Sequence, residues 1–157
     1  MTQKEKLNRR LQDAAESGQL DKVRDLIAAG AQIDIADENG MQALHIAVYR
    51  SRLSVVKFLL EKGARIDAVD DEGWTPLHYV DHLPVAEFLL EAGADPAAVN
   101  KDGKMPVNVA DDPEVLVLLK KWSEPEFLEK RRQEANVKVI REHWKRMGRF
   151  TPSCPRI

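Results

Sequence analysis

Apolar residues in the first three-quarters of the chain are spaced as on one face of a short helix, and these stripes come in pairs. Within each stripe, apolar positions recur mainly at steps of three and four, which is the period of an α-helix. Neither helix of a pair can bury its stripe alone, so stability must come from packing against neighbours. The first two pairs are predicted from Leu11, Ala14 and Ala15, from Val23, Leu26 and Ile27, from Leu44, Ala47 and Val48, and from Leu53, Val55, Val56, Leu59 and Leu60.

The stretch from Asp37 to Val69 recurs one unit further along the chain. Gly40 and Gly73 are 33 residues apart, and a Leu-His pair follows four residues after each glycine. Self-similarity at a fixed period of this length is typical of repeat arrays, in which each unit packs on its neighbours. The sequence therefore predicts a stack of helix pairs.

The third unit contains Gly-Trp-Thr-Pro-Leu-His at 73–78, an apolar run at 85–90 and Gly-Ala-Asp at 93–95. This unit resembles the ankyrin repeat, whose signature includes Thr-Pro-Leu-His. The second unit has Gln-Ala at 42–43 where the family has Thr-Pro, but it keeps Leu-His-Ile-Ala at 44–47. The resemblance implies an all-α ankyrin-repeat helical solenoid with short β-hairpin or turn tips, about four repeats and a C-terminal helix.

The chain is expected to divide into three parts. The repeats occupy residues 1–122, a basic amphipathic helix follows at 123–147, and residues 148–157 form a flexible tail. The repeats are expected at about 7–36, 37–69, 70–99 and 100–122.

The third and fourth units are shortened where the first helix meets the second. His45 precedes Phe58 by 13 residues, whereas His78 precedes Phe88 by ten. In the fourth unit, Asp-Asp-Pro at 111–113 takes the same place. The first helix of each of these units is therefore predicted to be about one turn short, with a proline at the start of the helix that follows.

Composition indicates a single soluble domain. Of the 157 residues, 43% are hydrophobic and 32% are charged, which is enough apolar content to bury a core. No apolar run approaches the roughly 20 residues that span a bilayer, and the N-terminal MTQKEKLNRR lacks the apolar region of a secretory signal. The single cysteine, Cys154, forms no internal disulfide, in agreement with a reducing compartment. We expect a cytoplasmic protein, with the nucleus as an alternative.

Charge is divided unevenly between the repeats and the C-terminal part. Residues up to Trp122 include 15 basic and 21 acidic side chains, whereas residues 123–157 include nine basic and five acidic ones. The two parts are therefore expected to attract each other or separate partners.

His45 and His78 stand at the histidine position of the Thr-Pro-Leu-His motif. The resemblance implies that each bonds its own repeat and neighbouring backbone, and Asn108 takes this position in the fourth unit. No nucleophile, base and orienting group are spaced as a triad, and no glycine-rich phosphate loop follows a strand. The sequence therefore predicts a protein that is not an enzyme, with no bound cofactor and no metal site.

In proteins that resemble this chain, partners bind the hairpin tips and the inner face of the first helices. Carried over and with Asp112 added, these positions include eight acidic and three basic side chains. A basic or polar protein segment is therefore favoured over nucleic acid, whose phosphates need a positive surface. Met41, Tyr49 and Trp74 are the predicted anchors, with packing against the next hairpin as the alternative for Trp74. The positions are Glu16 and Ser17; Glu38, Asn39, Met41, Tyr49 and Arg50; Asp71, Glu72, Trp74 and Asp81; and Lys101, Asp102, Lys104 and Asp111.

The segment Ser-Glu-Pro-Glu at 123–126 has the composition of a capping box with an early proline, so a helix is expected to begin there and to run to about Met147. Three roles remain open for this helix. It caps the last repeat beside Val115 and Leu118, it binds a groove of a partner, or it attaches to a membrane surface. Its apolar stripe consists of Val137, Ile140, Trp144 and Met147.

These features together predict a non-enzymatic protein–protein interaction module, such as an adaptor, a targeting subunit or an inhibitory subunit. Such a module holds a partner segment against the acidic inner surface, and a rigid stack loses little entropy on binding. The alternative is an autoregulated module. In that case the basic C-terminal helix occupies the same surface until a competitor displaces it, or itself binds the partner.

Overall fold

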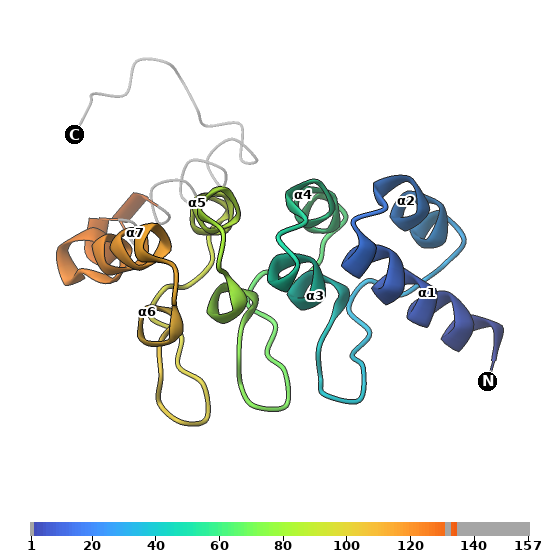
Figure 1. The fold of residues 1–157 in the computed structure, drawn as a ribbon, viewed down its shortest axis with the longest axis horizontal. Coiled ribbons are helices and arrows are strands. Elements are labelled where there is room, and N and C mark those ends of the chain that lie inside the picture. The colour runs from blue at the N-terminus through green and yellow to red at the C-terminus, as the bar shows by residue number, and fades with distance from the viewer. Residues whose placement is uncertain (1, 131–132, 135–157) are drawn as a thin grey trace, which may run out of the picture.

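The fold is a row of helix pairs (Figure 1), and the computed structural model describes residues 2–130 and 133–134. In each pair a first helix is followed by a tight turn and a second helix. The first helices form one layer, the second helices form another, and the loops between pairs project from one side of the row (Figure 1). The pairs are α1 (Gln3–Ser17) and α2 (Leu20–Ala28), α3 (Ala43–Tyr49) and α4 (Leu53–Glu61), the 3₁₀ helix η1 (Pro76–Tyr79) and α5 (Leu83–Ala92), and α6 (Pro106–Val109) and α7 (Pro113–Ser123).

The predicted helical solenoid is thereby confirmed. Its core lies between the two layers and continues from pair to pair. Leu44 and Leu77 hold equivalent positions in successive units, and each is only 1% exposed. Leu11 in the first pair and Leu119 in the last are also buried in this cluster. Burying a leucine contributes about 1.5–3 kcal/mol, so stability is spread along the stack.

The first helix begins at Gln3, which is earlier than the expected start of the first repeat at about residue 7. Thr2 precedes it as a capping residue, because its hydroxyl accepts a hydrogen bond from the Glu5 amide at 3.2 Å. In return, the Glu5 carboxylate accepts one from the Thr2 amide at 2.7 Å. The sequence signal for this start is Thr-x-x-Glu at 2–5, a capping box that apolar spacing does not detect.

The predicted shortening of the third and fourth units is confirmed. α3 has seven residues, whereas η1 and α6 have four each. Pro84 and Pro113 lie in the first turn of the helices that follow, where the missing amide of proline leaves no hydrogen bond unmade. The turn of α3 that carries Tyr49 therefore has no counterpart in η1.

The loop tips, residues 37–41, 70–74 and 100–104, are closed by one side chain each. In Asp37, Asp70 and Asn100, the side-chain Oδ1 accepts hydrogen bonds from the amides two and four residues further on, at 2.8–3.0 Å. Within the described residues the tips form turns, and no residue is assigned to a strand.

Neighbouring tips are also joined through their backbones. The Asp71 amide donates to the Asn39 carbonyl at 3.1 Å, and the Lys101 amide donates to the Glu72 carbonyl at 3.0 Å. The tips therefore form a connected edge along the row. We use "inner face" for the surface made by this edge together with the first helices.

Candidate functional site

Polar side chains at equivalent positions of the first helices fasten each unit to the next. The Nδ1 atom of His45 accepts a hydrogen bond from the Gln42 amide at 3.2 Å. Its Nε2 atom lies 3.0 Å from the Ala68 carbonyl and 3.1 Å from the Trp74 carbonyl. Because carbonyls only accept, the ring proton must lie on Nε2. The side chain therefore joins the start of α3 to the next tip.

His78 repeats this arrangement one unit later. Its Nδ1 accepts from the Thr75 amide at 3.1 Å and lies 2.9 Å from the Thr75 hydroxyl, while its Nε2 donates to the Lys104 carbonyl at 3.0 Å. In the first unit the Gln12 side-chain amide donates to the Ile35 and Met41 carbonyls, as a histidine Nε2 does in the later units. In the last unit the Asn108 side-chain oxygen accepts from the Met105 amide, as a histidine Nδ1 does. The structural role that the resemblance implies for both histidines is confirmed.

Burial lowers the pKa of both histidines, and the backbone carbonyls they bond oppose this shift only in part. Protonation would also place a second N–H against the donor that Nδ1 faces. Both imidazoles therefore remain neutral at pH 7. Among residues 2–130 and 133–134, no three histidine, cysteine, aspartate or glutamate side chains are grouped as metal ligands would be.

Three aromatic side chains meet on the inner face between the second and third units, and we call Tyr49, Trp74 and Tyr79 the aromatic cluster. The ring of Tyr79 lies 6.1 Å from that of Tyr49, nearly perpendicular to it, and 5.1 Å from that of Trp74. His45 and His78 contact the cluster at 6.1 and 5.6 Å. Tyr49 and Trp74, both predicted as anchors, are thus connected through Tyr79, which was not among the predicted residues.

Tyr79 is held by a buried carboxylate. Its hydroxyl donates to Oδ2 of Asp70, whose Oδ1 closes the third-unit tip. Burial raises the pKa of Tyr79, as do this hydrogen bond and the negative charges of Asp70, Asp37 and Glu72. Tyr79 therefore stays a neutral donor. The signal that could have identified it is an aromatic residue directly after Thr-Pro-Leu-His, where the preceding unit has Ile46.

The aromatic cluster is open to solvent on one side. Tyr49 is 51% exposed, and Trp74 and Tyr79 are half-buried. This exposure agrees with the shortening of η1, which ends where a longer helix would continue beside Tyr49. Large apolar side chains that remain exposed in the middle of a surface are a common feature of protein-binding sites.

The other predicted residues surround the cluster along the edge of the tips. Met41 is half-buried at the first tip, and its carbonyl accepts from Gln12 and from the Asp37 amide. The remaining tip positions, together with Asp81, are exposed and mostly acidic, and the bases stand in the last tip. They are Glu38, Asn39, Asp71, Glu72, Asp81, Lys101, Asp102 and Lys104.

A groove of about 570 Å³ lies between α1 and the first tip. Glu5, Asn8, Arg9 and Gln12 form one wall, and residues 35–39 form the other. Glu38 and Asn39 were predicted as binding residues, whereas the α1 wall was not.

A family model for ankyrin repeats in three copies matches residues 11–100, which is more than half of the chain. The chain belongs to the ankyrin-repeat family. No curated protein matches it. Ankyrin repeats are generally protein–protein interaction modules and typically carry no enzymatic activity. In the part of this ankyrin-repeat chain that the structure describes, no helix combines the length and apolar character needed to cross a membrane.

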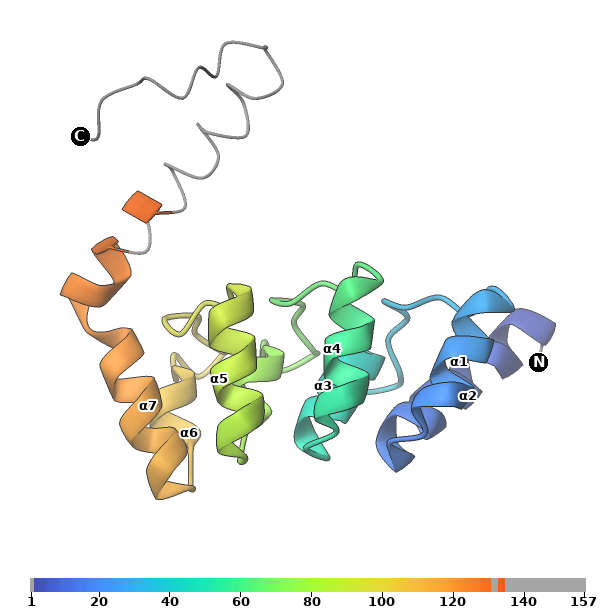
Figure 2. The same cartoon turned by 90° about the horizontal axis from the view of Figure 1, so that it is seen from above.

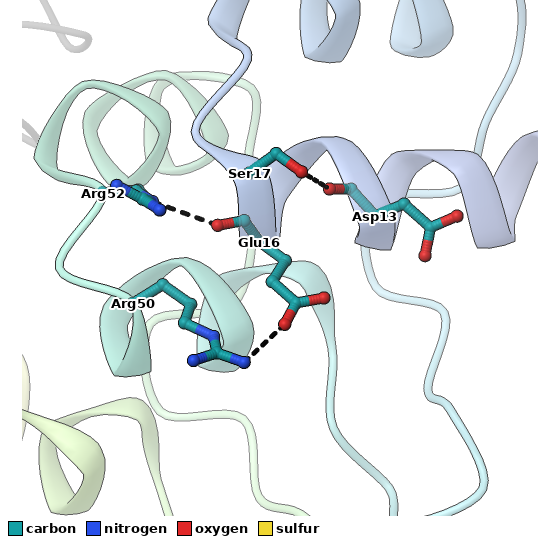
Figure 3. Close-up of polar contacts among 5 residues, drawn as sticks. All are labelled: Asp13, Glu16, Ser17, Arg50 and Arg52. Atoms are coloured by element: carbon teal, nitrogen blue, oxygen red, sulfur yellow. Dashed lines mark hydrogen bonds and ion pairs between the residues drawn. The ribbon is translucent and has the colours of Figure 1, made fainter.

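The end of α1 in this ankyrin-repeat stack is tied to the turn between α3 and α4 (Figure 3). The Arg50 guanidinium lies 2.5 Å from the Glu16 carboxylate, and both side chains are about half exposed, at 47% and 49%. The predicted Ser17 is exposed, and its hydroxyl donates to the Asp13 carbonyl of the same helix at 2.8 Å (Figure 3). The charges of Arg50 and Glu16 offset each other, so Lys101 and Lys104 are the unpaired bases of the predicted set.

Arg52 makes a different contact with the same helix (Figure 3). Its Nε donates to the Glu16 carbonyl at 3.0 Å, and its side chain lies so close to Gly18 that an added Cβ there would come within 2.8 Å. We expect Arg52→Ala to lower the free energy of unfolding by about 1–1.5 kcal/mol, because it removes a helix C-cap and packed methylenes. Arg50→Ala, with the same charge change, should cost about 0–1 kcal/mol, as exposed ion pairs do. Urea unfolding of both variants measures the difference, and equal losses would contradict this assignment.

The C-terminal segment begins as a helix at residues 125–130, directly after Glu124. Ser123 does not cap it, since Ser123 is the last residue of α7 and its hydroxyl donates to the Leu119 carbonyl at 2.7 Å. The rings of Trp122 and Phe127 lie 4.9 Å apart across the junction. Figure 2 shows residues 125–130 running on past the end of α7 rather than folding back along it. The predicted stripe of Val137, Ile140, Trp144 and Met147 lies outside the described residues.

Proposed function

We propose that this ankyrin-repeat protein holds a basic or polar segment of a partner protein against its inner face. It would do so without catalysis, as an adaptor, a targeting subunit or an inhibitory subunit in the cytoplasm. The observation that supports this proposal is the exposed aromatic cluster in the middle of an acidic surface. Aromatic side chains supply most of the affinity in protein interfaces, and the surrounding charges select the partner.

The rigidity of the inner face supports the same proposal. The three tips are closed by Asp37, Asp70 and Asn100, and backbone hydrogen bonds join each tip to the next. A surface that is already ordered loses little conformational entropy when a partner binds. More of the contact energy therefore appears as affinity.

Charge reversal at the tips tests the proposal. In the double variant Glu38→Lys, Glu72→Lys, both changes lie on exposed tip positions, so folding should be preserved. The matched control is Glu61→Lys, Glu87→Lys, which makes the same charge change at exposed positions of α4 and α5. Proteins captured by the wild type and the control, but not by the tip variant, are the expected partners. Direct titration of one such protein should show at least about tenfold weaker binding to the tip variant. If both variants bind like the wild type, the inner face is not the binding surface.

The uneven charge of the chain supports a second candidate function, the autoregulated module. Residues 123–157 carry nine basic and five acidic side chains, opposite in balance to the repeats. Replacing Lys138, Arg141, Lys145 and Arg146 by glutamine in the full chain would weaken a tail that occupies the inner face. Tighter partner binding by that variant supports autoregulation, and unchanged binding argues against it.

A further inference from the structure

We infer that the aromatic cluster is a subsite for one positively charged side chain, an arginine or a lysine, of the bound segment. This inference rests on the proposed function, because it names the group that the inner face recognises. Position in the repeat alone predicts Tyr49 and Trp74 as anchors for apolar contact. The geometry around Tyr79 points to a cation instead.

The structure contains an internal example of this contact at the edge of the cluster. The guanidinium of Arg50 lies 5.3 Å from the ring centroid of Tyr49. A cation within about 6 Å of an aromatic face is attracted by the ring's negative potential. The ring of Tyr49 therefore already accepts a guanidinium, which is held in place by Glu16.

In the layer of second helices, aromatic rings make the same contact with cations of the chain itself. Arg24 lies 5.1 Å from the Phe58 ring centroid, and Lys57 lies 5.3 Å from that of Phe88. Each of these rings is thus paired with a cation of the chain itself. Between residues 2 and 130, no cation of the chain lies over Trp74 or Tyr79 in this way.

Carboxylates around Tyr79 add a negative field at this position. Asp70 accepts the hydrogen bond of the Tyr79 hydroxyl, and the charges of Asp37 and Glu72 also act on that hydroxyl. The field that disfavours a tyrosinate here favours a cation against the same ring. Asp81 adds an exposed carboxylate, which accepts from the Ser51 hydroxyl at 3.0 Å.

An apolar side chain would fit this site less well than a cation. It would cover the exposed carboxylates of Glu72 and Asp81 and remove their water without offering a donor, and burying charge in this way is costly. A cation can contact the rings and the carboxylates together. Arginine should bind at least as well as lysine, because a planar guanidinium stacks on aromatic rings and bonds carboxylates with several N–H groups.

Small probes test the subsite in the full-length chain. We would titrate the ¹⁵N-labelled protein with N-acetyl-arginine amide and follow the Trp74 indole N–H and the backbone amides of residues 72–81 by NMR. The neutral probe N-acetyl-citrulline amide has nearly the same shape. We expect saturable shifts confined to this region, with binding at least about fivefold tighter for the arginine probe than for the citrulline probe. N-acetyl-lysine amide should bind between the two. Equal binding of the charged and neutral probes would overturn the inference.

Two matched pairs of variants locate the contact. Tyr49→Leu should weaken the arginine probe about threefold, whereas Tyr49→Phe, which keeps the ring face, should leave it unchanged. Arg50→Gln frees one face of Tyr49 and should strengthen binding about twofold or more. Lys57→Gln makes the same charge change in α4, on the other layer, and should have no such effect. Identical affinities for Tyr49→Leu and Tyr49→Phe, or for Arg50→Gln and Lys57→Gln, would place the probe elsewhere.

The results separate this inference from the proposed function. If the tip variant loses the partner while the arginine probe fails to bind the aromatic cluster, the inference is wrong and the proposed function stands. If the probe binds as expected while the tip variant keeps every partner, the proposed function is wrong and the subsite stands.

Discussion

Replacing Gly40 by alanine is expected to lower the free energy of unfolding by about 3 kcal/mol. Gly40 has a φ of +77°, and an L-residue in this conformation costs roughly 1–2 kcal/mol. The added Cβ would also lie 2.5 Å from the Asp71 amide nitrogen and 2.6 Å from its carboxylate. That amide is fixed by its hydrogen bond to the Asn39 carbonyl, so the next tip cannot move away without breaking the connected edge. Urea unfolding followed by circular dichroism measures the loss.

The equivalent glycines of the other tips are matched controls. Gly73 and Gly103 have the same backbone conformation, with φ of +77° and +73°. An added Cβ would come within 3.1 Å of the Lys101 amide at Gly73 but would meet nothing within 4 Å at Gly103. Alanine should therefore cost most at Gly40, less at Gly73 and only the conformational term, roughly 1–2 kcal/mol, at Gly103. Equal losses at the three sites would show that close packing between tips contributes nothing.

The repeating parts of the fold were predictable from the sequence because the same physical requirement recurs in each unit. A large apolar side chain is needed where a first helix meets the core, so Leu44 and Leu77 stand out by their equivalent spacing. The shortening of the third unit followed from the distance between His78 and Phe88 along the chain, and that of the fourth from Asp-Asp-Pro at 111–113. The start of α1 was also encoded in the sequence, by the capping box at Thr2, although apolar spacing does not detect such a motif.

The candidate site was less predictable, because it depends on contacts between units. Tyr49 and Trp74 were identified from their positions in the repeat, but their connection through Tyr79 requires α3, the third tip and η1 to be placed in space. The pairing of Arg50 with Glu16, which offsets two charges of the surface, was also not predictable. The two residues are 34 positions apart and meet only in the folded stack. Residues that differ from unit to unit give no periodic signal, and these are the residues that form the site.

The same distinction applies to Asp70. Its role in closing a tip is shared with Asp37 and Asn100, so it belongs to the repeat. Its second oxygen accepts from Tyr79, and this bond occurs where the third unit alone has a tyrosine after Thr-Pro-Leu-His. The repeat thus supplies a fixed carboxylate, and the tyrosine of the third unit is held in the aromatic cluster by bonding to it.

Acidification is expected to destabilise the stack through its two neutral histidines. The folded-state pKa of His45 and of His78 is lowered by burial from the usual 6.5. The unfolded chain therefore binds more protons than the folded chain as the pH falls below 6.5 and until it reaches the lowered values. The contribution of the two neutral histidines to the free energy of unfolding is fully present above pH 6.5. It falls in this window by up to about 1.4 kcal/mol per pH unit for each histidine. Urea midpoints measured from pH 7.5 downward give the slope.

Glutamine substitutions show whether these two side chains cause the loss. Gln12 already makes the two carbonyl bonds in the first unit, so His45→Gln can keep the bonds to the Ala68 and Trp74 carbonyls and lose the acceptor for the Gln42 amide. The variant should therefore lose about 1–3 kcal/mol of unfolding free energy at pH 7.5. The contribution of His45 to the pH dependence of that free energy should also disappear. The double variant with His78→Gln should show little pH dependence in this window. His82→Gln, a change at an exposed position, is the control that should keep the full slope. If the double variant keeps it as well, the histidine bonds between units are not what acid breaks.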